Sequence, residues 1–122
     1  MQYRIESSKA FSEVTFDLDP IVQRLGFVVL ARQDIGELLR QHGGEYDEDY
    51  MVFSVCNYRL LDSLLCHGEM AARLPPKISV WTNHGSTWLA CDQFESGGKT
   101  SGSSTQIEEL NARLQQIITE TR

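Results

Sequence analysis

The sequence has little of the material from which common site motifs are built. Its three cysteines, Cys56, Cys66 and Cys91, form neither a CxxC pair nor a Cys/His spacing typical of a metal site. Its longest purely apolar run covers residues 27–31, whereas a membrane-spanning helix needs about 20 apolar residues. No apolar signal segment opens the chain. Together with the odd number of thiols, this predicts a cytoplasmic protein without metal or cofactor.

Positive charge is also scarce. Eleven Lys and Arg residues face seventeen Asp and Glu residues, which gives a net charge of −6 and a pI of about 4.9. Nucleic acids and anionic membranes are bound largely through clustered Lys and Arg side chains, and the basic residues here are scattered along the chain. We therefore expect neither nucleic acid nor a membrane as a partner.

The length of 122 residues fits a single domain, 1–122. A chain of this size buries roughly two-thirds of its unfolded surface, so it needs neither a disulfide nor a metal to fold. A Gly/Ser-rich stretch at residues 95–104 predicts a flexible loop before the C-terminal helix.

Alternating and continuous apolar stretches predict five strands. They cover residues 2–6, 27–31, 50–56, 77–82 and 87–91. The run at 27–31 is apolar throughout and predicts a buried strand. The last two strands flank Asn83-His84-Gly85, which predicts a hairpin turn and places Trp81 and Trp88 on either side of it.

Apolar stripes at helical spacing predict four helices between these strands. The first opens at Ser7 or Ser8, closes at Gly26, and is either kinked or restarted at Pro20. The other three begin after Asp34, after Asn57 with an end at Gly68, and at the capping box of Thr105 and Glu108. The resulting order, β-α-β-α-β-α-β-β-α, predicts an α+β fold. We expect a mixed, mainly antiparallel sheet with helices packed on one face.

Four segments resemble motifs of one family, the domain-of-unknown-function 302 family. They are Ser7-Ser8-Lys9-Ala10-Phe11, Leu25-Gly26-Phe27, Val55-Cys56-Asn57 and Leu74-Pro75-Pro76. Two positions depart from the family pattern, because Tyr58 stands where the family has proline and Pro76 where it often has cysteine. The resemblance implies an architecture like that of the TATA-box-binding protein, a curved antiparallel sheet with helices on one side. It does not imply DNA binding, against which the acidic charge argues.

Cys56 is the candidate for chemistry, because it ends a strand one residue before the probable helix cap Asn57. The positive end of a helix lowers the pKa of a thiol and favours an anion nearby. The plainer interpretation is a buried cysteine that fills the strand–helix junction, since free cysteine is among the most buried residue types. If the helix end does form a site, the sequence predicts a ligand pocket there, formed by Cys56, Asn57, Tyr58, Pro75 and Pro76.

Other motifs are weaker. Gly97-Gly98-Lys99-Thr100 resembles the tail of a phosphate-binding loop, but glycine is missing five residues before Gly98. The acidic residues at 45–49 lack the loop pattern of a calcium site and are read as solvated. Trp81 and Trp88 either stack across the hairpin or line a pocket or subunit contact.

The sequence leaves three functions open. The sequence favours a non-catalytic domain that binds a small ligand or a protein, compatible with a homodimer through the sheet or hairpin. The alternative is a thiol-dependent enzyme or redox sensor that uses Cys56. An adaptor role within a larger complex would instead use the surface around the two tryptophans.

Overall fold

The structure, a computed structural model, describes residues 1–66, 70–95 and 101–122, with side chains from residue 105 onward in the last range. Its elements along the chain are β1 Gln2–Ser7, α1 Phe11–Arg24, β2 Val28–Asp34, α2 Ile35–Gln41, β3 Tyr50–Cys56, α3 Tyr58–Leu65, a 3₁₀ turn Ala71–Arg73, β4 Lys77–Asn83, β5 Ser86–Asp92 and α4 Ser101–Thr121. None of the helices in these described ranges combines the length and hydrophobicity of a membrane-spanning segment.

The strands form a five-stranded sheet in the order β1-β5-β4-β3-β2. Each neighbouring pair in it is antiparallel. The α+β fold and the order of elements predicted from the sequence are confirmed. The mixed character allowed for in that prediction is absent from the described strands. Strands β1 and β2 run in the same direction, but they lie at opposite edges of the sheet and do not pair with each other.

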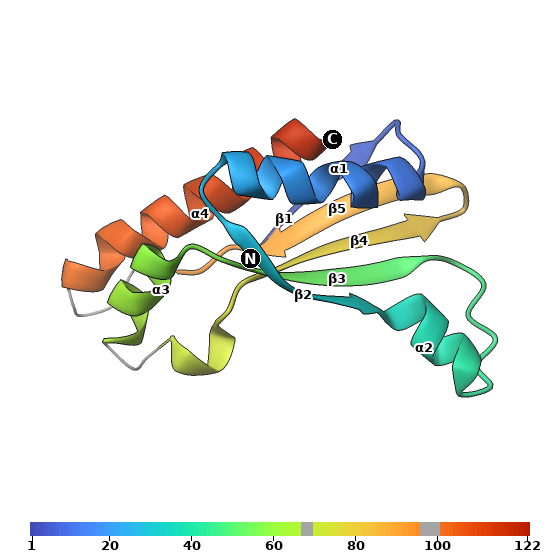
Figure 1. The fold of residues 1–122 in the computed structure, drawn as a ribbon, viewed down its shortest axis with the longest axis horizontal. Helices are drawn as coiled ribbons and strands as arrows, with labels where there is room; N and C mark the ends of the chain where they lie inside the picture. The colour runs from blue at the N-terminus through green and yellow to red at the C-terminus, as the bar shows by residue number, and fades with distance from the viewer. Residues whose placement is uncertain (67–69, 96–100) are drawn as a thin grey trace.

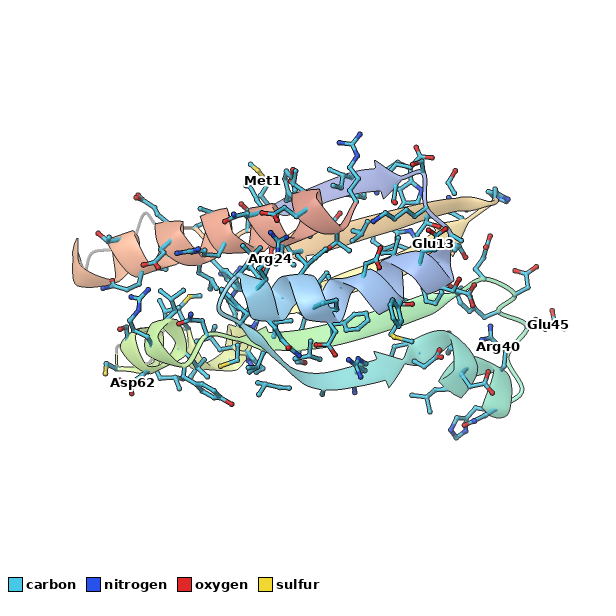
Figure 2. The ribbon with its side chains drawn as sticks, turned by 45° about the horizontal axis from the view of Figure 1, so that its top comes forward. Met1, Glu13, Arg24, Arg40, Glu45 and Asp62 are labelled. Atoms are coloured by element: carbon cyan, nitrogen blue, oxygen red, sulfur yellow. The ribbon has the colours of Figure 1, made fainter. Side chains whose placement is uncertain are left out.

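The helices α1 and α4 run side by side over one face of the sheet (Figures 1 and 2). Side chains from this face and from both helices form one buried cluster, which includes Val14, Leu18, Val22, Phe53, Ile78, Val80, Leu89, Leu110, Leu114, Ile117 and Ile118. Arg24, labelled in Figure 2, lies between the end of α1 and α4, and its guanidinium pairs with the Glu120 carboxylate. The core therefore occupies a single layer between the helices and the sheet.

The predicted start of the first helix is wrong. Helix α1 begins at Phe11, with Ala10 rather than Ser7 or Ser8 at the capping position, and it continues through Pro20 without a restart. The Ser7 hydroxyl is engaged elsewhere, since it accepts a hydrogen bond from the Lys9 amide and donates one to the Arg122 carbonyl, both at 3.1 Å. A serine that joins two chain segments is not available to cap a helix.

The second strand is also less buried than predicted. Phe27 is buried just before the strand, but β2 is exposed from Leu30 to its end at Asp34. Strand β2 lies at the edge of the sheet, and its pairing with β3 shifts register between Val29 and Ala31. An apolar run does not distinguish a central strand from an edge strand, and here the topology makes the difference.

Helix α4 begins at Ser101 rather than at Thr105, so Thr105 and Glu108 lie inside the helix and do not form a capping box. Of the loop predicted at 95–104, residues 96–100 lie outside the described residues, and so does the whole phosphate-loop-like segment at 97–100. The predicted helix end at Gly68 lies outside them as well. Helix α3 ends at Leu65.

The predicted hairpin is confirmed. Strands β4 and β5 are joined at His84 and Gly85, whose φ angles are 50° and 87°. Two consecutive residues with positive φ are typical of the tight turns whose twist matches that of the flanking strands. Trp81 lies directly opposite Trp88, and their rings stack with centroids 6.5 Å apart.

Asn57 caps α3 as predicted and also holds the end of α1. Its side-chain oxygen accepts from the Leu60 amide, and its side-chain nitrogen donates to the Gly26 carbonyl, each at 3.0 Å. Gly26 adopts a φ of 84°, a conformation that glycine reaches without a steric penalty. The one amide group therefore joins the start of α3 to the exit of α1.

We expect Asn57→Ala to lower the free energy of unfolding by about 1–2 kcal/mol, because it removes a helix cap and a second hydrogen bond. Asn57→Asp keeps the capping oxygen and loses only the bond to Gly26, so its effect should be smaller. Urea unfolding monitored by circular dichroism measures both. An alanine variant as stable as the original protein would contradict this role.

Candidate functional site

Cys56, the residue singled out by the sequence, lies sealed in the core at the end of β3. Its side chain is 1% exposed. The hollow beside it has a volume of about 10 Å³ and is lined by Cys56, Asn57, Leu60, Leu61, Leu64, Leu74, Pro76 and Leu110. Burial raises the pKa of the Cys56 thiol, which disfavours the thiolate needed for nucleophilic or redox chemistry.

The structure brings together three of the five residues of the predicted pocket. Cys56, Asn57 and Pro76 line the same hollow, whereas Pro75 does not line it and Tyr58 is 67% exposed. A cavity of this volume is about the size that one water molecule needs, and an organic ligand needs roughly 300 Å³ or more. Cys56 and Pro76 therefore read as packing residues, and Asn57 as a cap.

The remaining thiols do not form a site with Cys56. Cys91 is buried in the core, where burial raises its pKa to about 12, and Cys66 is exposed on the surface. Within the described ranges, no group of three His, Cys, Asp or Glu side chains is placed to hold a metal ion.

The sheet face opposite to α1 and α4, here called the outer face, carries a different set of side chains. The pairing of Ser79 with Ala90 and with Val52 places three small or medium side chains in one row across strands β5, β4 and β3. Trp81 pairs with Trp88 and with Tyr50, which places three aromatic side chains in the adjacent row. Alternation along each strand puts both rows on the same face.

A row of small side chains beside a row of large ones produces a trough. A hollow of about 420 Å³ is lined by Gln2, Tyr46, Tyr50, Ser79 and Trp81. A second hollow of about 250 Å³ is lined by Gln2, Lys77, Ser79, Ala90, Cys91 and Asp92. Because the two share Gln2 and Ser79, we treat them as one feature, the outer-face trough, with an aromatic end at Trp81 and a polar end at Lys77.

The aromatic end is held in place by neighbours. The rings of Trp81 and Trp88 are nearly parallel, at an interplanar angle of 16°, and the Arg4 guanidinium lies over the Trp88 ring at 5.4 Å. These contacts restrict the Trp81 side chain before any ligand arrives. A pre-ordered aromatic wall costs less conformational entropy on binding than a mobile one.

The loop before β3 completes this end of the trough. Tyr46 is partly buried, and its hydroxyl donates to the Asp49 carbonyl at 3.3 Å. Burial, with the nearby carboxylates of Glu48 and Asp49, raises the pKa of the Tyr46 phenol and keeps it neutral. Tyr46 therefore lines the trough as an uncharged aromatic side chain.

Glu48 fastens this loop to the hairpin. Its carboxylate accepts from the His84 amide and from the Thr82 hydroxyl, both at 2.8 Å. The Thr82 hydroxyl in turn accepts from the Asp49 amide at 2.9 Å. These hydrogen bonds, first that from His84 and then that from Thr82, lower the pKa of the Glu48 carboxyl.

Of the residues that line the larger hollow, the sequence pointed only to Trp81. Gln2, Tyr46, Tyr50 and Ser79 come from four separate stretches, and no spacing along the chain connects them. Alternation could have assigned Tyr50, Ser79 and Trp81 to outward-facing positions. The strand order that makes them neighbours was not available from periodicity.

Comparison with known proteins identifies the family and the fold of the chain. The family model described as the domain of unknown function DUF302 matches residues 3–121. The chain belongs to the DUF302 family. The crystal structure of an uncharacterized conserved DUF302 protein from Bacillus stearothermophilus superimposes with a TM-score of 0.90 at 19% identity, over 99% of this chain and 98% of that one. At that identity the likeness shows the fold alone. A comparison with curated proteins gives no match.

The segments that resemble DUF302 motifs lie where the ends of helices and strands contact one another. They do not line the trough. Lys9 forms an ion pair with Asp17 at 2.9 Å and donates to the Thr121 carbonyl at 3.0 Å, so it fastens the end of α4 beside α1. Gly26 and Asn57 are bonded to each other as described above. In this protein, these motif residues thus hold elements of the DUF302 fold together. The trough is lined by other positions.

The positions of the thiols lead to a labelling prediction. In the native protein, iodoacetamide should alkylate Cys66 while Cys56 and Cys91 stay unmodified, and all three should react in denaturant. Peptide mass spectrometry of the labelled protein distinguishes the sites. Rapid alkylation of Cys56 near neutral pH would contradict the burial of its thiol and would support a thiol-dependent activity.

The hydrogen bonds that Glu48 accepts from His84 and Thr82 lead to a prediction about pH. Because its carboxyl pKa is lowered in the folded state, Glu48 stabilises the fold above its ordinary pKa of 4.5, and this stabilisation is lost as the pH falls through that value to the folded pKa. Glu48→Gln should therefore lose less stability than the original protein between about pH 7 and about pH 3. Urea unfolding at both pH values measures this. Glu45→Gln, in the same loop, serves as the charge control and should retain the original pH dependence.

Proposed function

We propose that this DUF302 member is a non-catalytic binding domain that holds a small organic molecule in the outer-face trough. The observation that carries the proposal is the aromatic wall of Trp81, Tyr50 and Tyr46 beside a floor at Ser79, around a hollow of about 420 Å³. This volume falls within the range of small-molecule sites, which are mostly apolar with a few polar groups.

The shape of the trough favours a flat ligand. Ser79 lies two residues along β4 from Trp81 on the same face, so a ring placed on the floor would lie against the aromatic wall. Offset or edge-to-face aromatic contacts of this kind contribute about 0.5–1.5 kcal/mol beyond the burial of area. The Ser79 hydroxyl and the Gln2 amide are residue types that both donate and accept hydrogen bonds, so they would orient a polar substituent.

The other functions considered from the sequence have less support. The burial of Cys56 and the raised pKa of its thiol argue against a thiol-dependent activity. A homodimer through the sheet would place a second copy over the same trough and would compete with a ligand. Sedimentation velocity over a range of concentrations tests that alternative directly.

A neutral planar fragment tests the proposal. Naphthalene-2-methanol has about twelve non-hydrogen atoms, and at about 0.3 kcal/mol per atom its dissociation constant should be on the order of 1 mM. In ¹H–¹⁵N NMR titrations we expect saturable shifts at the Trp81 indole and at the amides of β3 and β4. Ser79→Phe fills the floor and should abolish these shifts.

Gln33→Phe is the matched control, because Gln33 pairs with Val52 at the exposed edge of the same sheet and lies outside the trough. It should leave binding intact. If Ser79→Phe does not fold, Tyr50→Ala removes part of the wall and should weaken binding instead. Shifts that do not saturate, or that are unchanged in both variants, would overturn the proposed site.

A further inference from the structure

The charge around the trough differs from that of the protein as a whole. The chain carries a net charge of −6, yet two cationic side chains lie beside the trough. Lys77 lines its polar end together with Gln2 and Ser79. Arg4 is on β1 opposite Ala90, and its guanidinium lies over the Trp88 ring.

The acidic groups near the trough are largely engaged by other partners. The Asp92 carboxylate accepts from the Arg73 guanidinium at 2.7 Å. Glu48 is held by the Thr82 hydroxyl and the His84 amide. Glu6 lies opposite Trp88 on β1, one outer-face position further along the strand than Arg4. The Lys77 ammonium donates to a neutral partner, the Pro75 carbonyl, at 3.3 Å, while Asp92, which lines the same hollow, is bonded to Arg73.

We propose that the trough selects a planar aromatic carboxylate. The ring would lie against Trp81 and Tyr50, and the carboxylate would lie at the polar end, where the Lys77 ammonium attracts it and Arg4 adds to the positive potential. This inference rests on the proposed function and adds the chemical class of the ligand. A single negative charge suits this end because the cations come from two separate strands and form no multidentate cradle such as a phosphate group requires.

Three probes that differ in one substituent test the charge preference. They are naphthalene-2-carboxylate, the neutral naphthalene-2-methanol and the cationic naphthalene-2-methylammonium, each titrated by NMR at low ionic strength. We expect the carboxylate to bind about fivefold to tenfold more tightly than the alcohol, and the ammonium to bind more weakly than both. Raising the salt to about 0.5 M should reduce the preference, because ions screen exposed charges.

Two charge-removing variants locate the preference. Lys77→Gln should reduce the advantage of the carboxylate over the alcohol, both measured in the same variant, to about twofold or less. Arg24→Gln is the matched control, because it changes the net charge equally but lies on the helical side, paired with Glu120. It should leave the preference intact.

The possible results separate this inference from the proposed function. Equal binding of the carboxylate and the alcohol, or a preference that survives in Lys77→Gln, would overturn the charge assignment while the trough remained a binding site. Failure of all three probes to give saturable shifts would overturn the proposed function as well. A stable dimer in sedimentation that masks the Trp81 resonances would assign the face to a second copy and would overturn both.

Discussion

The packing of α1 and α4 against one face of the sheet is the constraint on which the other features of the structure depend. It buries the inward-facing side chains of the strands, such as Phe53, Ile78 and Leu89, in a single layer. Because side chains alternate along a strand, the same packing fixes which residues lie on the outer face. The helices are held there by bonds at their ends, from Lys9 to the end of α4 and from Asn57 to the exit of α1.

The trough follows from the register of β3, β4 and β5 as much as from the residues in them. Ser79 and Ala90 are opposite each other, and Trp81 is opposite Trp88. A slip by one residue would turn these side chains toward the helices and place the core residues in solvent. The same pairing that satisfies the core therefore creates a row of small side chains next to a row of aromatic ones, without any further requirement on the fold.

The candidate site shows where inference from sequence is weakest. Cys56 was a reasonable candidate because a thiol before a helix cap has a physical route to reactivity. Its environment argues against that route, since Leu60, Leu64 and Leu110 line the small hollow beside it and burial raises its pKa. The sequence does not point to the trough, because its lining residues Gln2, Tyr46, Tyr50 and Ser79 lie in separate segments and form no motif. The segments that resemble the family motifs and the candidate ligand site are therefore different parts of the molecule.

The sequence by itself determined the local structure: the order of strands and helices, the hairpin at His84 and Gly85, and the caps at Asp34 and Asn57. These features depend on neighbours within a few residues, through periodicity, backbone conformation and side-chain capping. Only the tertiary structure decided that β2 is an exposed edge, that Ser7 bonds to Arg122, and that Gln2 lines a trough with Trp81. Those contacts join residues far apart in the chain, and strand order, which local periodicity does not encode, brings them together.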